Sequence, residues 1–382
     1  MMRGGGTMLT VLLLSGSLMC ACGGGGASSS DSGSNPPQVK ADTPSISAAA
    51  AQNGAQIVTV SDATSGAKIY YTLDGTAPTT SSQVYQAPFL VTSNLTVKAM
   101  AAAASDSNSD VASQSFSPNI ASGTLVWSDE FSNPASAPAQ PNASTWTYDT
   151  GTNCCGNNEL ETYCAWGSTS GPCDPSNPNA YVGSDGSLHV MARKAAANVY
   201  TSARLKSQGL FSFMHGRIEA RMKLPESQGM WPAFWMLGNN IATINWPACG
   251  ELDIMEHIDG NNPPIDGKPA GYDWVAGSVH GGTSGNEANG SEVYHPAGFS
   301  AAAWHTYGMI WSKEKVEYYI DDPSNIYATF TPANFPGTWP FDQGPQFVIL
   351  NLAVGGDWPG NPDATTVFPG EMTVDYVRVY TN

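Results

Sequence analysis

The stretch GRIEARMKL, residues 216–224, alternates charged and apolar side chains at every position and is therefore typical of a β-strand. Its charged members are Arg217, Glu219, Arg221 and Lys223. Because successive side chains of a strand point to opposite faces, one face of this strand is expected to join a core. The other face is polar, and it either meets solvent or lines a groove.

The same pattern continues on both sides, over residues 124–382. Short apolar runs such as SLHVMARK, WHTYGMIWS, KVEYYID and MTVDYVRVY follow one another with almost no helical periodicity. About 260 residues of this kind predict one large antiparallel two-sheet sandwich, so the chain is expected to be all-β.

A smaller sandwich is predicted over residues 41–118, where runs such as QIVTVSD, AKIYYTLDG and NLTVKAMAA are bounded by turn residues. The segment SPNIASG, residues 117–123, separates it from the larger one. Tyr70 and Tyr71 must face opposite sides of their strand, so at least one of them is expected in the core.

The N-terminal residues 1–22 read as a signal peptide, with one arginine and then an apolar run too short to span a bilayer. The small residues around Cys22 resemble the lipobox of bacterial lipoproteins, which predicts a lipid anchor at Cys22. The Gly- and Ser-rich residues 23–40 are expected to form a flexible linker. We therefore expect an exported protein, either a cell-surface or outer-membrane lipoprotein or a secreted protein.

The charge balance, 15 Lys and Arg against 32 Asp and Glu, excludes a nucleic-acid partner because no basic stripe could neutralise phosphates. A neutral polymer is the better match, and a monomer is expected.

Without Cys20 and Cys22, the chain keeps five of its seven cysteines: Cys154, Cys155, Cys164, Cys173 and Cys249. Five is odd, so at least one thiol has no partner within the chain. Export favours disulfides among the first four, whose spacing fits a zinc site poorly. The pairing stays open.

The segment GELDIMEHIDG, residues 250–260, places acidic residues in an otherwise buried strand. Glu251 and Asp253 share one face of a regular strand, but Glu256 lies five positions from Glu251 and would face the other side. A β-bulge at Ile254 or Met255 would bring all three carboxylates to one face.

Such a group suits glycosidic bond cleavage, in which one carboxyl protonates the leaving oxygen and another attacks the sugar or activates water. The spacing permits either mechanism. Two other interpretations stay open: a solvated acidic face, and a metal site at Glu256, His257 and Asp259, which is a poor chelate because adjacent strand residues diverge. GMWPAFWMLG, residues 229–238, adds Trp231 and Trp235 on one face, either in the core or as stacking surfaces for sugars.

Residues 124–382 resemble glycoside hydrolase family 16, and within it the laminarinase-like endo-β-1,3-glucanases. The motifs that carry the resemblance occur in the family's order: LVWSDEF, GNNELETY, GRIEARMKLP, GMWPAFWMLG, WPACGELDIMEH, VHGG, WHTYGMIW, FVILNLAVGG and VDYVRVY. The resemblance implies a β-jelly roll with a concave cleft, a retaining mechanism and no cofactor for catalysis. Residues 41–118, with IYYTLDGTAPT, resemble the C-terminal domain of chitobiases, a spacer more often than a binding module.

The resemblance also implies site residues. Glu251 matches the nucleophile, Asp253 the assisting acid and Glu256 the general acid/base, with the spacing of the family's β-bulge subgroup. The substrate-binding positions that it implies are Trp231, Trp235, Asn158, Arg204, His280, His257 and Gln343. A structural calcium ion is implied at Glu130, Gly186 and Asp375, whose oxygens suit calcium.

The expected activity is endo-hydrolysis of internal β-1,3 bonds in laminarin-type β-glucans. The alternatives are a mixed-linkage glucanase, a transglycosylase of the same family, an enzyme for a sulfated galactan, which the acidic charge disfavours, or a non-catalytic glucan-binding surface protein. The Cys-rich residues 151–175 depart from the family pattern beside the cleft, which leaves the preferred polymer open.

Overall fold

The computed structural model describes residues 39–382 except 105, 134, 136–137, 153–155, 259–272 and 284. The predicted signal peptide, the lipid anchor at Cys22, nearly all of the linker, Cys154, Cys155 and Asp259 lie outside the described residues. Within the described part of the chain, no helix is long and apolar enough to cross a membrane.

The N-terminal part is a small sandwich of two antiparallel sheets. One sheet has the order β1 (Ser45–Ala50), β2 (Gln56–Ser61), β5 (Phe89–Val91), and the other β4 (Gln83–Val84), β3 (Lys68–Thr72), β6 (Leu95–Ala102), β7 (Ala112–Phe116). Val58, Val97, Phe89 and Tyr71 fill the space between them. Tyr71 is buried and Tyr70 is half-buried, so the prediction that one of the pair is a core residue is confirmed.

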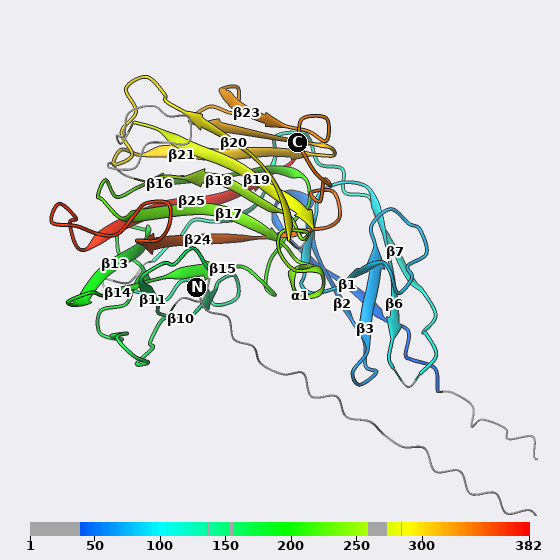
Figure 1. Ribbon diagram of the computed structural model, residues 1–382. Coiled ribbons are helices and arrows are strands. Elements are labelled where there is room, and N and C mark those ends of the chain that lie inside the picture. Colours follow the sequence, from blue (N-terminus) through cyan, green and yellow to red (C-terminus); the bar gives the residue numbers. More distant parts are fainter. Residues whose placement is uncertain are drawn as a thin grey trace, which may run out of the picture. The chain divides into compact units, whose positions relative to one another are not determined.

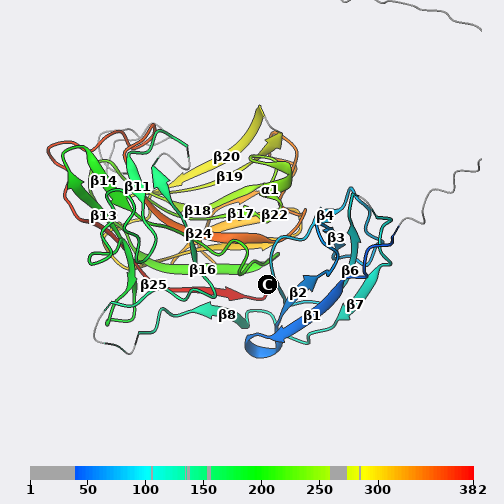
Figure 2. The same cartoon turned by 90° about the horizontal axis from the view of Figure 1, so that it is seen from below.

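The C-terminal part contains two large sheets that form two layers, one with β18 and β19 and the other with β16, β25 and β8 (Figure 2). The seven-stranded sheet has the order β20 (Asn286–Tyr294), β19 (Val275–Thr283), β18 (Glu251–Glu256), β17 (Met230–Gly238), β24 (Gln346–Val354), β15 (Arg204–Lys206), β9 (Thr147–Asp149). One short helix, α1 (Ile241–Ile244), follows β17 (Figure 1). The predicted all-β fold is therefore confirmed.

The second layer is an eleven-stranded sheet. Its path is β10 (Gly151–Thr152), β11 (Glu161–Tyr163), β14 (Val199–Ser202), β13 (Leu188–Ala196), β25 (Gly370–Tyr380), β16 (Gly216–Lys223), β21 (His305–Ser312), β22 (Lys315–Ile320), β23 (Ile326–Phe330), with β12 (Ala180–Val182) beside β13 and β8 (Leu125–Asp129) beside β25. Among the described pairs in this sheet, β11 and β14 run parallel and the others antiparallel.

Strand β16 shows how the alternating sequence produces the layers. Ile218, Ala220 and Met222 are completely buried in the core between the sheets, as their period of two requires. On the opposite face, Arg217 covers the ring of Tyr380 at 3.8 Å and Arg221 that of Trp304 at 4.6 Å. The polar face of GRIEARMKL thus forms cation–π contacts on the outside of the eleven-stranded sheet and does not line the cleft described below.

Candidate active site

A β-bulge in β18 decides the geometry of the site. In the pairing of β18 with β17, Asp253 lies opposite Trp235, and Met255 lies opposite Phe234, the residue before Trp235. Ile254 therefore lies opposite no residue of β17. The register with β19 shifts in the same place, between Asp253 and Glu256. Ile254 and Met255 are both buried in the core, and Glu256 returns to the face of Glu251. The bulge that the parity of GELDIMEHIDG predicts is therefore present.

The three carboxylates line one cleft with a cavity volume of about 750 Å³. The wall residues come mainly from neighbouring strands of the seven-stranded sheet: Trp231, Ala233, Trp235 and Leu237 from β17, Ser278 and His280 from β19, Glu287, Asn289 and Ser291 from β20, and Asn351 and Ala353 from β24. Alternate positions of each strand face the cleft because side chains repeat with a period of two. The carboxylates are thus in a walled groove and not on a solvated face, which excludes the plain surface interpretation.

Two tryptophans donate hydrogen bonds to the two glutamates. Trp231 Nε1 donates to Glu256 Oε1 over 3.0 Å, and Trp246 Nε1 donates to Glu251 Oε2 over 3.0 Å. Trp231 lies on β17, whereas Trp246 belongs to the loop before β18 and is 42% exposed. Each glutamate is therefore fixed by an indole that also borders the groove.

His280 lies on the same face as Glu251 and Asp253 because it pairs directly with Glu251 across β18 and β19. Its Nε2 lies 3.2 Å from Asp253 Oδ2 and 4.0 Å from Glu251 Oε1. Its Nδ1 forms a 2.7 Å hydrogen bond with Glu287 Oε1. His280 therefore bridges the carboxylates of β18 and an acidic residue of β20.

Burial and mutual repulsion hold protons on this group. Burial, together with the charge of Asp253, raises the pKa of Glu256 to about 8, against the weaker lowering by His280 and by the bond from Trp231. Burial and Asp253 also raise the pKa of Glu251, and His280 opposes that rise. Burial raises the pKa of Asp253, while contact with His280 lowers it. Carboxyls this close cannot all ionise cheaply, so one proton is retained near neutral pH.

Trp235 lies opposite Asp253, the middle carboxylate of β18, and makes both a hydrogen bond and a cation–π contact. Its Nε1 donates to Asn351 Oδ1 over 2.7 Å, and the guanidinium of Arg204 lies 4.5 Å from its ring. Arg204 is held in turn by Asp149, 3.0 Å from its Nε. Trp231 and Trp235 both border the cleft, with Phe234 and Met236 buried behind them, as their spacing predicts.

Asn158 lies at the rim. It is exposed, its side-chain nitrogen is 3.0 and 3.1 Å from the two carboxylate oxygens of Asp357, and its neighbours Asn157 and Glu159 line the cleft. The structure thus gathers Glu251, Asp253 and Glu256 with Trp231, Trp235, Arg204 and His280, and it places Asn158 beside them.

Two predicted substrate-binding residues do not reach the cleft. His257 is completely buried, and its Nδ1 is 2.9 Å from the carbonyl oxygen of Trp274. It follows Glu256 directly, so it faces the opposite side of the strand; burial lowers its pKa to about 4. Gln343 is exposed on the loop before β24 and does not line the cleft. The structure therefore places neither residue on the wall of this cleft.

Two of the three predicted calcium residues, Glu130 and Asp375, do not fit a cation in this arrangement. Both oxygens of Glu130 accept hydrogen bonds from Arg378, at 2.9 and 2.8 Å. Asp375 accepts one from Arg221 at 2.7 Å. Carboxylates neutralised by arginines are poor ligands for calcium, so we assign no role to a metal at these residues.

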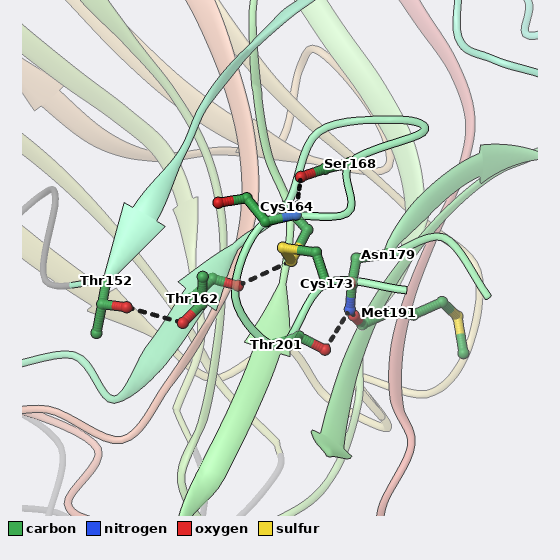
Figure 3. Close-up of a disulfide and its surroundings, with 9 residues drawn as sticks. Thr152, Thr162, Cys164, Ser168, Cys173, Asn179, Met191 and Thr201 are labelled. Atoms are coloured by element: carbon green, nitrogen blue, oxygen red, sulfur yellow. Dashed lines mark hydrogen bonds between the residues drawn. A yellow bond between two sulfur atoms is a disulfide. The ribbon is translucent and has the colours of Figure 1, made fainter. Parts of the chain in front are cut away.

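The cysteine-rich segment carries one disulfide within its described residues, between Cys164 and Cys173 (Figure 3). Cys164 directly follows β11. In that strand the hydroxyl of Thr162 forms a 2.8 Å hydrogen bond with the hydroxyl of Thr152 (Figure 3). A bridge among the first four cysteines is thus confirmed. Cys249 is a free, buried thiol, and burial raises its pKa to about 12.

Among the cleft residues that the sequence analysis does not name are Trp246, Asn351 and Glu287. Trp246 stands in the motif WPACGELDIMEH, five residues before Glu251, so proximity to the acidic strand was an available signal. Asn351 and Glu287 reach the cleft only through strand pairing, which no local pattern specifies.

Two sequence profiles match the chain. Residues 173–378 match "Glycosyl hydrolases family 16", and residues 47–113 match "Chitobiase/beta-hexosaminidase C-terminal domain". A beta-glucanase of Rhodothermus marinus is 37% identical over 272 residues, which cover 67% of this chain and 84% of that protein. Several other curated relatives are longer, and the matches span 34–54% of their length.

Solved structures agree with the profiles. The laminarinase catalytic domain of Thermotoga maritima is 35% identical, with a TM-score of 0.56 over 69% of this chain and 99% of that domain. A non-specific endo-β-1,3(4)-glucanase from family 16, solved with 1,3-β-D-cellobiosyl-glucose at its active site, is 34% identical, with a TM-score of 0.52 over 68% of this chain and 95% of that one.

Proposed function

The chain belongs to glycosyl hydrolases family 16, and from this premise we propose that it is a retaining endo-glycosidase that cuts internal β-1,3 bonds of laminarin-type β-glucans. The observation that carries the proposal is the bulge at Ile254, which places Glu251, Asp253 and Glu256 on one wall of the cleft. A polysaccharide cleft with this carboxylate set can supply an acid and a nucleophile to the same bond.

Glu256 is proposed as the general acid/base. Its raised pKa, about 8, keeps a proton on the carboxyl at neutral pH, and that proton passes to the oxygen of the leaving sugar as the glycosidic bond breaks. The hydrogen bond from the Trp231 indole holds this carboxyl in one position in the groove.

Glu251 is proposed as the nucleophile. Its carboxylate attacks the anomeric carbon as the leaving group departs, which forms a glycosyl–enzyme ester; ionised Glu256 then removes a proton from water, and the water cleaves the ester. Two displacements at one carbon return the original β configuration. His280, whose Nε2 lies 4.0 Å from Glu251 Oε1, counters the negative charge of Glu251 during these steps, whereas Asp253, between the two on the same face, raises the pKa of Glu251.

A neutral glucan suits the walls of the cleft. Trp231, Trp235, Trp246 and Trp358 border it with flat apolar faces, and Asn289, Asn351 and Arg204 offer hydrogen bonds to hydroxyls. Aromatic faces with a few polar groups are the usual equipment for binding sugar rings. The protein's formal charge of −17 opposes sulfated polymers.

A mixed-linkage β-1,3-1,4-glucan is the second candidate substrate, because a 34% identical relative is described as a non-specific endo-β-1,3(4)-glucanase. A binding protein without activity is a third possibility, and the presence of all three carboxylates opposes it.

The decisive experiment exposes the purified protein to laminarin, curdlan, lichenan, agarose and xyloglucan and follows the new reducing ends by anomeric NMR. We expect the β-anomer first, with internal cleavage of laminarin and curdlan. The α-anomer first would contradict retention, cleavage of lichenan alone would favour the mixed-linkage activity, and no release from any polymer would favour the binding protein.

A further inference from the structure

We propose that Glu287 is a positioning residue for this reaction, which acts by keeping His280 protonated on both ring nitrogens beside Asp253 and Glu251. The inference rests on the proposed function of the cleft. It assigns a task to an acidic residue of the edge strand β20 that stands outside the carboxylate group of β18.

Strand pairing explains how Glu287 reaches the histidine. On β19 and β20, His280 is directly opposite Asn289, and Glu287 is two residues from Asn289 on the same face. A diagonal neighbour of this kind is within reach of a long side chain. Glu287 Oε1 lies 2.7 Å from His280 Nδ1, and its side chain is 37% exposed at the border of the cleft.

The second ring nitrogen faces acceptors as well. His280 Nε2 lies 3.2 Å from Asp253 Oδ2 and 4.0 Å from Glu251 Oε1. Ionised carboxylates accept hydrogen bonds and cannot donate them, and a neutral imidazole has one N–H. Only the imidazolium can donate in both directions, so Glu287 on one side and Asp253 on the other together select the charged ring.

The charged groups around His280 agree with this state. Glu251 and Asp253 face it from β18, Glu256 lies further along β18, and Glu287 faces it from β20. Arg204 of β15 also borders the cleft and lowers the pKa of Glu251. Burial opposes the charge on His280, but Asp253, Glu251 and Glu287 outweigh it and raise its pKa to about 10.

The charge on His280 affects the ionisation of Glu251, the proposed nucleophile. Glu251 must be ionised to attack, yet burial and Asp253 raise its pKa, and the charge of His280 counters them. In the wild type, Glu256 loses its proton at a lower pH than His280 loses its own, since their pKa values are about 8 and about 10. Without Glu287, the pKa of His280 falls toward that of Glu256, and the imidazolium beside Glu251 is lost at a lower pH.

The test compares Glu287→Gln, which keeps the size of the side chain and removes its charge, with Glu292→Gln. Glu292 is exposed on the same strand but five positions away, and so on the opposite face. For each variant, kcat/KM on soluble laminarin is measured from pH 4 to pH 10, and the His280 ring is titrated by ¹⁵N NMR, with its signals identified by their loss in His280→Asn.

In Glu287→Gln we expect the NMR titration of His280 to move down by about 1–3 pH units, since an opposite charge at this distance shifts a pKa by about that much. The alkaline limb of kcat/KM should move down with it to the extent that the pKa of His280 falls below that of Glu256, about 8. Near pH 5, where the ring is charged in either case, kcat/KM should stay within about tenfold of the wild type. Glu292→Gln should move neither curve.

Two outcomes would overturn the proposal: a loss of activity equal at every pH with an unmoved His280 titration, or a neutral His280 in the wild type at pH 7. If the wild type cleaves no glucan, the proposed function fails, while the NMR titration still decides the link between Glu287 and His280.

Discussion

Trp231 and Glu256 are joined by a 3.0 Å hydrogen bond from the indole Nε1 to Oε1, between a residue on β17 and the last residue of β18. The bond favours the ionised carboxylate and lowers the pKa of Glu256, against the larger effect of burial that raises it. The indole N–H therefore lowers the upper pH limit that burial and Asp253 raise for the proposed acid.

Replacing Trp231 with phenylalanine keeps an aromatic face in the cleft and removes this donor. We expect the pKa of Glu256 to rise and the alkaline limb of kcat/KM to move to higher pH by roughly half a unit to one unit. Trp235→Phe is the matched control, because the Trp235 indole donates to Asn351 instead of a carboxylate. If both variants move the limb equally, the shift does not come from the bond to Glu256.

Glu256→Gln cannot transfer a proton. Loss of general acid/base catalysis should reduce kcat by about 10²–10⁴ on laminarin, with the alkaline limb near pH 8 abolished. Circular dichroism and the thermal unfolding midpoint should show a folded protein. A variant that keeps near-normal kcat would remove Glu256 from its role.

Glu251→Ala leaves a space where the carboxylate of the proposed nucleophile stood. Turnover should fall by at least about 10³. Added azide can enter the space and attack the anomeric carbon of an activated β-glucoside, so the product expected by NMR is an α-glycosyl azide. A β-glycosyl azide would instead indicate that Glu251 is the acid/base.

Glu161 makes folding stability depend on pH. It is 1% exposed, its Oε2 accepts the backbone N–H of Val354 at 2.7 Å, and burial, then Glu159, raise its pKa to about 8. A carboxyl whose pKa is higher in the folded than in the unfolded state binds more protons when folded, so its contribution to stability is lost as pH rises from about 4.5 to 8. In urea unfolding at pH 5 and pH 9, Glu161→Gln should lose less stability than the wild type over that interval; equal losses would contradict the burial argument.

The Cys164–Cys173 bridge closes a short loop with a sequence separation of nine. Replacing both cysteines with serine should lower the free energy of unfolding by about 2–3 kcal/mol, chiefly because the unfolded chain regains freedom. Chemical denaturation of both proteins under non-reducing conditions measures this difference in the free energy of unfolding. An unchanged midpoint would show that the loop is already ordered in the unfolded chain or relaxes without cost.

Much of the geometry of β18 could be predicted from the sequence because the alternation of side chains along a strand is a strict rule. Glu251 and Glu256, five positions apart, require a bulge if they share a face, and the register places it at Ile254. The same rule would have rejected His257, since a residue that follows a cleft-facing glutamate must face the core. The family resemblance implies His257 as a substrate contact, whereas the structure buries it.

The rest of the site depends on contacts between strands that are distant in sequence. Asn351 meets Trp235 because β24 lies beside β17, and Glu287 meets His280 because β20 folds back along β19. Periodicity identifies a strand and its two faces but not its neighbours in the sheet. The surroundings of the predicted calcium residues are hidden for a similar reason: the sequence offers oxygens at Glu130 and Asp375 but does not show the arginines that face them.

The bulge has one more consequence for how this cleft can change. Ile254 and Met255 are consecutive, yet both insert into the space between the sheets. The offset between the two glutamates is thus governed by the volume available inside the protein. A larger or smaller side chain at Ile254, out of reach of any sugar, would tilt one end of the strand relative to the other, and with it the gap that a glycosidic oxygen must fit. Substrate preference in this enzyme can therefore drift through interior substitutions while every residue on the cleft wall stays the same.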